Sequence, residues 1–298
     1  MLFCCISSQA QDSTQHNHNN NNRKWLVGGL SVAGYSGSLV ALNAAWYNQY
    51  EKTRFHTFND AGEWLQVDKV GHAWTAYNLS RASSAAWRWA GLQPKAAVWI
   101  GSGSGFAYLT VIEILDARSA RWGWSWPDMG ANLFGAALFA SQEMLWEQQR
   151  IQFKFSAHKT SYGVSLQPRA TELYGNTLAE RLLKDYNTQT YWLSMNLHSF
   201  FPRSSLPAWL NVSVGYGAEG LFGGYENKVV DKDGVVVFDR RDLKRYRQWY
   251  LAPDIDLSRI KTKNKLLKTG LSIFNAVKIP APALEYANGR LKLKAIAF

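Results

Sequence analysis

The stretch PKAAVWIGSGSGFAYLTVIEILDA, residues Pro94 to Ala117, decides the fold of the first half of the chain. Proline suits the first turn of a helix, so the sequence predicts one long helix that opens at Pro94 and runs to Ala117. Its glycines Gly101, Gly103 and Gly105 match neither the dinucleotide fingerprint nor the phosphate-binding loop in spacing. Small residues of this kind let helices approach closely, which predicts tight helix packing here rather than a nucleotide site.

Further helices flank this stretch on both sides. The sequence predicts one helix at Asp68–Trp89 and another at Trp126–Arg150. The segment Trp25–Tyr50 carries no charged residue and is long enough to span a bilayer. Its glycines, serines and asparagine dilute its hydrophobicity, so a marginal membrane helix and a buried core helix are both open.

After Arg150 apolar and polar residues begin to alternate. Alternation at period two, with aromatic and β-branched residues, predicts strands, and Asp231–Gly234 between two Val-rich runs predicts a hairpin turn. One helix, at about Asn176–Asp185, interrupts this half. The sequence therefore predicts an α+β fold, in which a bundle of about four helices precedes an antiparallel β-rich region. That region is either a small or partial outer-membrane-type barrel or an open sheet packed on the helices. The predicted strands are Ile151–Phe155, Tyr191–His198, Leu210–Tyr216, Tyr250–Leu257 and Leu291–Phe298.

These patterns divide the chain into residues 1–23, a signal remnant and linker, residues 24–150, the helical domain, and residues 151–298, the β-rich region. The first ten residues end in Ser-Gln-Ala, a small-x-small cleavage pattern, but lack a basic n-region, so we expect the true start codon upstream. The polar Asn/His-rich segment 11–22 predicts a disordered tether. The only cysteines, Cys4 and Cys5, precede the cleavage pattern, so the mature chain would lack disulfides. Acylation of Cys5 is the lipoprotein alternative, although its surroundings make a poor lipobox.

The net charge of +11 arises from 33 Lys and Arg against 22 Asp and Glu, and much of the excess lies between Arg240 and Lys268. A basic surface of this kind suits anionic lipid or lipopolysaccharide phosphate, and no nucleic-acid-binding module accompanies it. The 14 tryptophans are typical of a membrane–water interface, with a large aromatic core as the alternative. We therefore expect a membrane or anionic lipid as partner, an envelope protein as a possible second partner, and no nucleic acid.

Three short polar signatures interrupt the apolar first half. Residues three or four apart share one face of a helix, and burying such groups without partners costs several kcal/mol each. They must therefore contact one another, water or an ion. Ser125 or Asp128 is also well placed to cap the helix that begins near Pro127. The predicted polar network consists of Asp68, Lys69, His72, Glu113, Asp116, Arg118, Ser125, Asp128 and Asn132.

Two functional interpretations compete with a purely structural network. One is a divalent metal site, because carboxylates with one imidazole suit Mg²⁺, Mn²⁺, Ca²⁺ or Zn²⁺. The other is acid–base catalysis with His72 as the base and Glu113 and Asp116 as carboxylates, while Lys69 and Arg118 are available to bind an anion. No cofactor besides a divalent metal ion is indicated. The candidate metal ligands are Asp68, His72, Glu113, Asp116 and Asp128.

The blocks DKVGH from Asp68, Glu-x-x-Asp-x-Arg from Glu113, and GWSWPDMGANLFGA from Gly123 resemble the predicted periplasmic lipoproteins of the YfiM type, a domain of unknown function. The likeness to VanZ-like membrane proteins is looser. The resemblance spans about Asp68–Ala140 and implies a compact helical domain in the cell envelope with no established reaction. The added β-rich half gives the chain the layout of an envelope protein of a Gram-negative bacterium. Carried over residue by residue, the family pattern falls on Asp68, Lys69, His72, Glu113, Asp116, Arg118, Gly123, Trp124, Ser125, Trp126 and Asp128.

The sequence favours a non-enzymatic function, a structural or interaction role at the periplasm or outer membrane. A metal-assisted hydrolase or transferase acting on a lipid or cell-wall substrate is the first alternative. A small channel or lipid-binding barrel is the second, and it depends on the β-rich half alone. The expected location is the cell envelope, in the periplasm or at the outer membrane.

Overall fold

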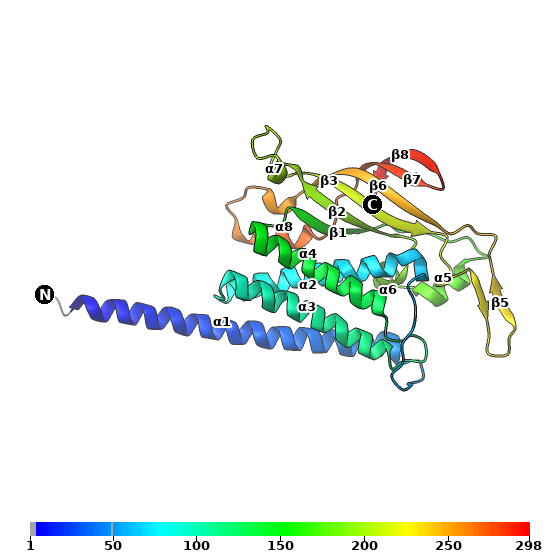
Figure 1. Ribbon diagram of the computed structural model, residues 1–298, viewed down its shortest axis with the longest axis horizontal. Helices are drawn as coiled ribbons and strands as arrows, with labels where there is room; N and C mark the ends of the chain where they lie inside the picture. The colour runs from blue at the N-terminus through cyan, green and yellow to red at the C-terminus, as the bar shows by residue number, and fades with distance from the viewer. Residues whose placement is uncertain (1–3, 49) are drawn as a thin grey trace. The chain divides into compact units, whose positions relative to one another are not determined.

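The structure, a computed structural model, describes residues 4–48 and 50–298 (Figure 1). Its fold is α+β, as the sequence predicts, with two units. The helical unit comprises the chain up to Asn59 together with Thr75–Gln148, and the β unit comprises Asp60–Trp74 and Gln149–Phe298. Residues 1–3 of the predicted signal remnant lie outside the described part of the chain.

The predicted helices of the first half are confirmed, and local chemistry sets their ends. Pro94 lies in the first turn of its helix, and Ser125 caps the next one, because its Oγ accepts a hydrogen bond from the backbone N of Asp128 at 3.0 Å. Gly91, with φ +86°, lies in the turn between two helices. The elements are α1 (Cys4–Leu42), η1 (Asn43–Tyr47), α2 (Val67–Trp89), α3 (Pro94–Asp116) and α4 (Trp126–Trp146).

Helix α1 differs from the sequence prediction at its N-terminal end. It runs through residues 11–22, where the sequence predicts a disordered tether. That interval contains no proline or glycine, so nothing in it stops a helix that has already formed, although asparagine is a weak helix former. By length and composition alone, Asn20–Leu42 and Pro94–Asp116 could each cross a membrane.

Two glycines of α3 let it approach α2 closely. A Cβ atom built on Gly101 would lie 2.6 Å from the backbone N of Ser84 and 2.8 Å from the backbone O of Ser80. A Cβ on Gly105 would lie 3.1 Å from Ser80 Oγ. Gly103, between them, faces open space. Close packing at Gly101 and Gly105 therefore accounts for the glycine spacing, as the sequence predicts.

We predict that Gly101→Ala lowers the free energy of unfolding of the chain by about 1–3 kcal/mol, because the new methyl group meets backbone rather than a flexible side chain. The matched control is Gly103→Ala, which should be neutral or stabilising by up to about 1 kcal/mol, since alanine is the better helix former. Denaturant unfolding followed by circular dichroism measures both. Equal stability of the two variants would contradict close packing at Gly101.

The β unit contains one main sheet and one hairpin. All neighbouring strands are antiparallel, in the order β1-β2-β3-β6-β7-β8, and β4 pairs with β5. The short helical elements of the β unit are η2 (Glu63–Gln66), which precedes α2, and α5 (Gln167–Tyr174), α6 (Leu178–Lys184), α7 (Leu197–Phe200), η3 (Leu257–Arg259) and α8 (Lys265–Phe274), which lie between strands. The strands are β1 (Ile151–Ala157), β2 (Gln189–Asn196), β3 (Leu210–Glu219), β4 (Lys228–Val230), β5 (Val236–Asp239), β6 (Tyr246–Ile255), β7 (Ala281–Ala287) and β8 (Arg290–Ala297).

The five predicted strands, the helix near Asn176–Asp185 and the hairpin turn at Asp231–Gly234 are confirmed, with Gly234 at φ +81°. The described strands do not close into a barrel, because β1 and β8 are the two edges of an open sheet, which is one of the two predicted alternatives. Strand β7 lies outside the predicted strands. The turn that follows it, Asn288-Gly289, carries the strongest short hairpin signal, and both residues have positive φ.

The sheet has two chemically opposite faces. Successive side chains of a strand point to opposite faces. The strand register places Gln152, Ser194 and Ser213 in one row, and the same face also carries a buried apolar cluster of Trp192, Tyr250, Ala252 and Ala283. Most polar side chains of this face are buried, whereas the aliphatic side chains on the other face are between 36% and 77% exposed; the aromatic Phe153 and Tyr191 on that other face are buried. The polar face carries Gln152, Lys154, Ser194, Asn196, Asn211, Ser213, Gln248, Asp254, Glu285, Lys292 and Lys294. The apolar face carries Phe153, Tyr191, Leu193, Met195, Val214, Trp249, Leu251, Leu284, Tyr286, Leu291 and Leu293.

An ion pair shows that the sheet curves toward its polar face. Lys154 Nζ on β1 lies 2.7 Å from Asp254 Oδ2 on β6, and both side chains are fully buried. Strands β2 and β3 lie between β1 and β6, which would separate the outer backbones by about 14 Å in a flat sheet. The pair therefore requires marked curvature, with the polar face concave.

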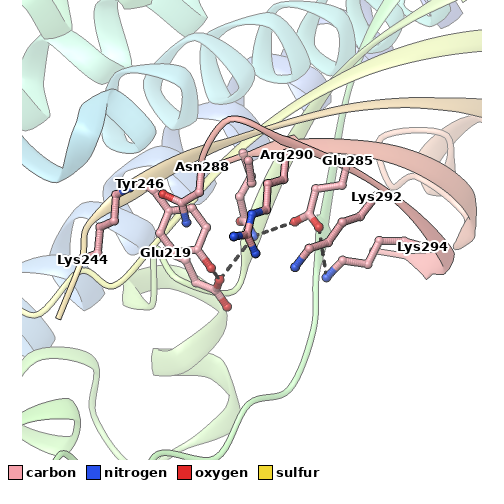
Figure 2. A pocket seen from close by; sticks show the side chains of 10 residues that line it. Glu219, Lys244, Tyr246, Glu285, Asn288, Arg290, Lys292 and Lys294 are labelled. Carbon is pink, nitrogen blue, oxygen red and sulfur yellow. Dashed lines mark hydrogen bonds and ion pairs between the residues drawn. The ribbon is translucent and has the colours of Figure 1, made fainter.

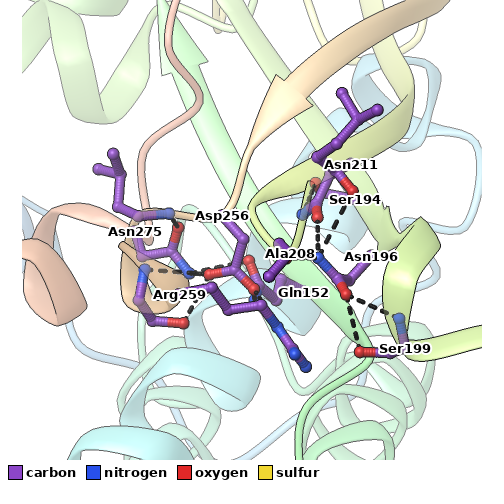
Figure 3. A network of polar contacts seen from close by, with 12 residues as sticks. Gln152, Ser194, Asn196, Ser199, Ala208, Asn211, Asp256, Arg259 and Asn275 are labelled. Carbon is purple, nitrogen blue, oxygen red and sulfur yellow. Dashed lines mark hydrogen bonds and ion pairs between the residues drawn. The ribbon is translucent and has the colours of Figure 1, made fainter. Parts of the chain in front are cut away.

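Amide and hydroxyl groups complete the polar face (Figure 3). Gln152 Nε2 donates to Asp256 Oδ2 at 2.5 Å, and Asn275 Nδ2 donates to Gln152 Oε1 at 2.8 Å. On the neighbouring strands, Asn196 Nδ2 donates to Asn211 Oδ1 at 2.8 Å. Buried polar groups need such partners, since leaving one unpaired costs about 1–3 kcal/mol.

Candidate functional site

The helical unit holds a pair of buried carboxylates at the junction of α3 and α4. Glu113 lies one turn before the end of α3, and Asp128 lies in the first turn of α4. Both are almost fully buried, and a carboxylate oxygen of one lies within 4.8 Å of a carboxylate oxygen of the other. Ser125 joins them, because its backbone N donates to Glu113 Oε2 at 3.2 Å while its Oγ caps the backbone N of Asp128. Asn132, one turn further along α4, is also buried.

Two other predicted residues of the helical unit lie at the end of α3. Asp116 is its last residue, and its Oδ1 accepts a hydrogen bond from the Tyr47 hydroxyl at 2.9 Å. Burial and the charge of Asp116 raise the pKa of the Tyr47 phenol, which keeps it a hydrogen-bond donor. Arg118 lies just beyond the helix and is exposed, unlike the buried carboxylates.

The remaining predicted residues, Asp68, Lys69 and His72, belong to the β unit at the start of α2. Lys69 Nζ contacts Asp68 Oδ2 at 2.9 Å and Asp60 Oδ2 at 2.5 Å, and all three side chains are largely buried. His72, one helical turn after Asp68, is half-buried. Asp60 was missed by the sequence analysis because it lies in the loop before the helix, where helical spacing gives no signal.

These groups have distinct chemical capacities. The Glu113–Asp128 pair presents carboxylate oxygens close together, the donor set that hard divalent cations prefer. The Asp60–Lys69–Asp68 cluster is a charge-compensated ion-pair network, in which the lysine ammonium already bridges both carboxylates. A structural role for this second cluster therefore has direct support, because both of its carboxylates have a cationic partner.

Comparison with known proteins supports an envelope origin. Residues 57–143 match the family described as predicted periplasmic lipoprotein (DUF2279), a range that contains Asp60 and every residue of the predicted polar network. The match confirms the resemblance to a periplasmic lipoprotein domain of unknown function, and it supports a location in the cell envelope. No curated protein and no solved structure matches the chain.

We predict that Ser125→Ala lowers the free energy of unfolding by about 1–2 kcal/mol, because the first turn of α4 loses its cap. The control Ser141→Ala removes an exposed hydroxyl of the same helix and should change stability by no more than about 0.5 kcal/mol. Thermal and urea unfolding of both variants provide the comparison. A Ser125→Ala protein as stable as Ser141→Ala would refute the capping role.

Proposed function

We propose that this protein is a membrane-associated envelope protein with a structural or interaction role, and that its β unit places the apolar face of the sheet against lipid at the outer membrane. The observation that carries the proposal is the exposure of the aliphatic side chains on the apolar face of β3, β6, β7 and β8, opposite a face on which charged and amide side chains are buried. Leu251 and Leu293 on the apolar face are 48% and 77% exposed, whereas Asp254 on the polar face is 3% exposed. A sheet in water normally buries its apolar side.

Lipid explains this distribution of exposed and buried side chains better than water does. Strands of outer-membrane proteins alternate between apolar side chains toward lipid and polar side chains toward the interior. The same alternation holds here across β3, β6, β7 and β8, where Val214, Leu251 and Leu284 align in register on the apolar face. A continuous apolar surface of this kind marks an interaction site. The channel alternative required a closed barrel, which the described strands do not form.

Helix α8 provides a second, independent argument for lipid. Its sequence, KLLKTGLSIF, places lysine, threonine and serine on one side and the aliphatic and aromatic residues on the other. Leu266 and Phe274 are 85% and 67% exposed, so the apolar side is largely uncovered. No acidic residue occurs between Lys261 and Phe274, where four lysines lie. A basic amphipathic helix of this type lies in the interface of anionic membranes.

The test uses an environment-sensitive fluorophore on a single cysteine introduced into a Cys4→Ser/Cys5→Ser protein. At Leu293→Cys, on the apolar face, we expect the emission to shift to the blue when vesicles containing phosphatidylglycerol are added, because the label enters hydrocarbon. Quenchers attached to the acyl chains should then reduce its emission.

The matched control is Val164→Cys, a highly exposed position of the same unit in the loop between β1 and α5. Its label should keep a water-like emission with or without vesicles. If the label at residue 293 also stays water-like when the protein sediments with vesicles, another part of the chain binds the membrane and the proposed lipid-facing surface is wrong.

A second candidate, metal-assisted hydrolysis or group transfer on a lipid or cell-wall substrate, is favoured by the Glu113–Asp128 carboxylate pair alone. Within the helical unit, the candidate metal ligands are these two residues and Asp116 at the end of α3.

Metal content distinguishes this candidate from a structural network. After dialysis against Mn²⁺ or Zn²⁺, a metal site should retain about one equivalent of ion, and Asp128→Asn and Glu113→Gln should each reduce retention at least about tenfold. Glu51→Gln, which neutralises an exposed carboxylate of the helical unit, should have no effect. Retention that is substoichiometric in the unmodified protein, or unchanged by both substitutions, rules out the metal proposal.

A further inference from the structure

The concave side of the sheet ends in a charged pocket between β6, β7 and β8 (Figure 2). The cavity has a volume of about 390 Å³. Its lining contains two carboxylates, those of Glu219 and Glu285. It also contains four cationic side chains, those of Lys244, Arg290, Lys292 and Lys294. The pocket is therefore net positive, and none of its charged residues belongs to the sequence signatures of the helical half.

Both carboxylates of the pocket, those of Glu219 and Glu285, already accept hydrogen bonds from neighbouring side chains. Glu285 is nearly buried and accepts hydrogen bonds from Gln248 Nε2 at 3.0 Å and from the Tyr250 hydroxyl at 3.1 Å, and Lys294 Nζ lies 3.4 Å from it. Glu219 accepts from the Tyr246 hydroxyl. Burial and the glutamate charges raise the pKa of both phenols, so each tyrosine stays protonated and donates.

The other three cationic side chains of the pocket have positive charges that a bound anion could neutralise. Across residues 4–48 and 50–298, Lys244, Arg290 and Lys292 form no ion pair with a carboxylate. Figure 2 shows the side chains of Arg290 and Lys292 directed toward the same opening as the two glutamates. A guanidinium with two ammonium groups around a cavity is the donor set that binds phosphate oxygens, because the guanidinium binds them in a bidentate manner and the lysines add positive charge.

The position of the pocket indicates the source of the phosphate. Along β8, the cationic residues Arg290, Lys292 and Lys294 alternate with Leu291 and Leu293, so the same strand carries the pocket on one face and the exposed leucines on the other. Strand β8 is also an edge of the sheet. A lipid at this edge would lay its acyl chains along the leucines and turn its headgroup toward the pocket.

We propose that the pocket between β6, β7 and β8 binds the phosphate group of an anionic lipid. This proposal rests on the lipid-facing role of the apolar face, and it names the headgroup that the same edge of the sheet recognises. The two glutamates hold Tyr246, Gln248 and Lys294 in place, and Arg290 and Lys292 contact the phosphate.

The experiment measures binding of soluble dihexanoyl phosphatidic acid to the full chain in detergent by isothermal titration calorimetry. We expect saturable binding of one equivalent, weakened at least about tenfold by Arg290→Gln/Lys292→Gln, because charge-assisted hydrogen bonds are lost. The control Lys228→Gln/Lys232→Gln, which removes two positive charges from the β4–β5 hairpin of the same unit, should bind as the unmodified chain does.

Two further arms separate the possible outcomes. Inorganic phosphate should compete only weakly; competition at equal concentration identifies a free-phosphate site and overturns the lipid assignment. Equal binding by Arg290→Gln/Lys292→Gln and by the control overturns the pocket altogether. The fluorophore at residue 293, measured in the pocket variant, still reports membrane contact, so failure of the phosphate site is distinguishable from failure of the lipid-facing surface.

Discussion

The ion pair between Lys154 and Asp254 is the contact on which the architecture of the β unit depends. Two fully buried charges are stable only when they lie close together and their remaining hydrogen-bonding capacity is satisfied. Lys154 Nζ also donates to the backbone O of Ile255, and Asp254 accepts from Ser194 Oγ. Because these partners come from strands that are not neighbours, satisfying the pair bends the sheet. Curvature toward the polar face leaves the aliphatic side chains on the convex side, and the proposed contact with lipid follows from that geometry.

The elements of the fold were largely predictable, because each has a local signal. Pro94 and Ser125 define helix starts, and alternation defines β1, β2, β3, β6 and β8. The face that each strand buries was not predictable, because alternation has the same period whether the polar or the apolar side is turned inward. The strand register, which places Lys154, Trp192 and Gly215 on one face, and the exposed fraction of each side chain in the folded chain decide between the two possibilities.

The residues of the candidate site that lie on helices were predictable from the sequence, whereas the contacts made by loop residues were not. Helical spacing identified Asp68 and His72 as residues of one face, and it identified the polar end of α3. It gave no indication that Lys69 bridges Asp68 and Asp60, because Asp60 lies in a loop and the contact depends on tertiary structure. The cationic pocket was missed for a related reason. Its residues are distributed over β3, β6, β7 and β8, and they meet only once the strands pair.

The turn Asn288-Gly289 has a consequence for the chemistry of both surfaces of the sheet. Both residues adopt positive φ, which fixes a two-residue loop and pairs Ala287 with Arg290. A slip of one residue would exchange the leucines and the basic residues of β8 between the two faces. This dipeptide therefore fixes the register of β8 against β7. These two uncharged residues determine which side chains of β8 lie on the apolar face and which on the polar face.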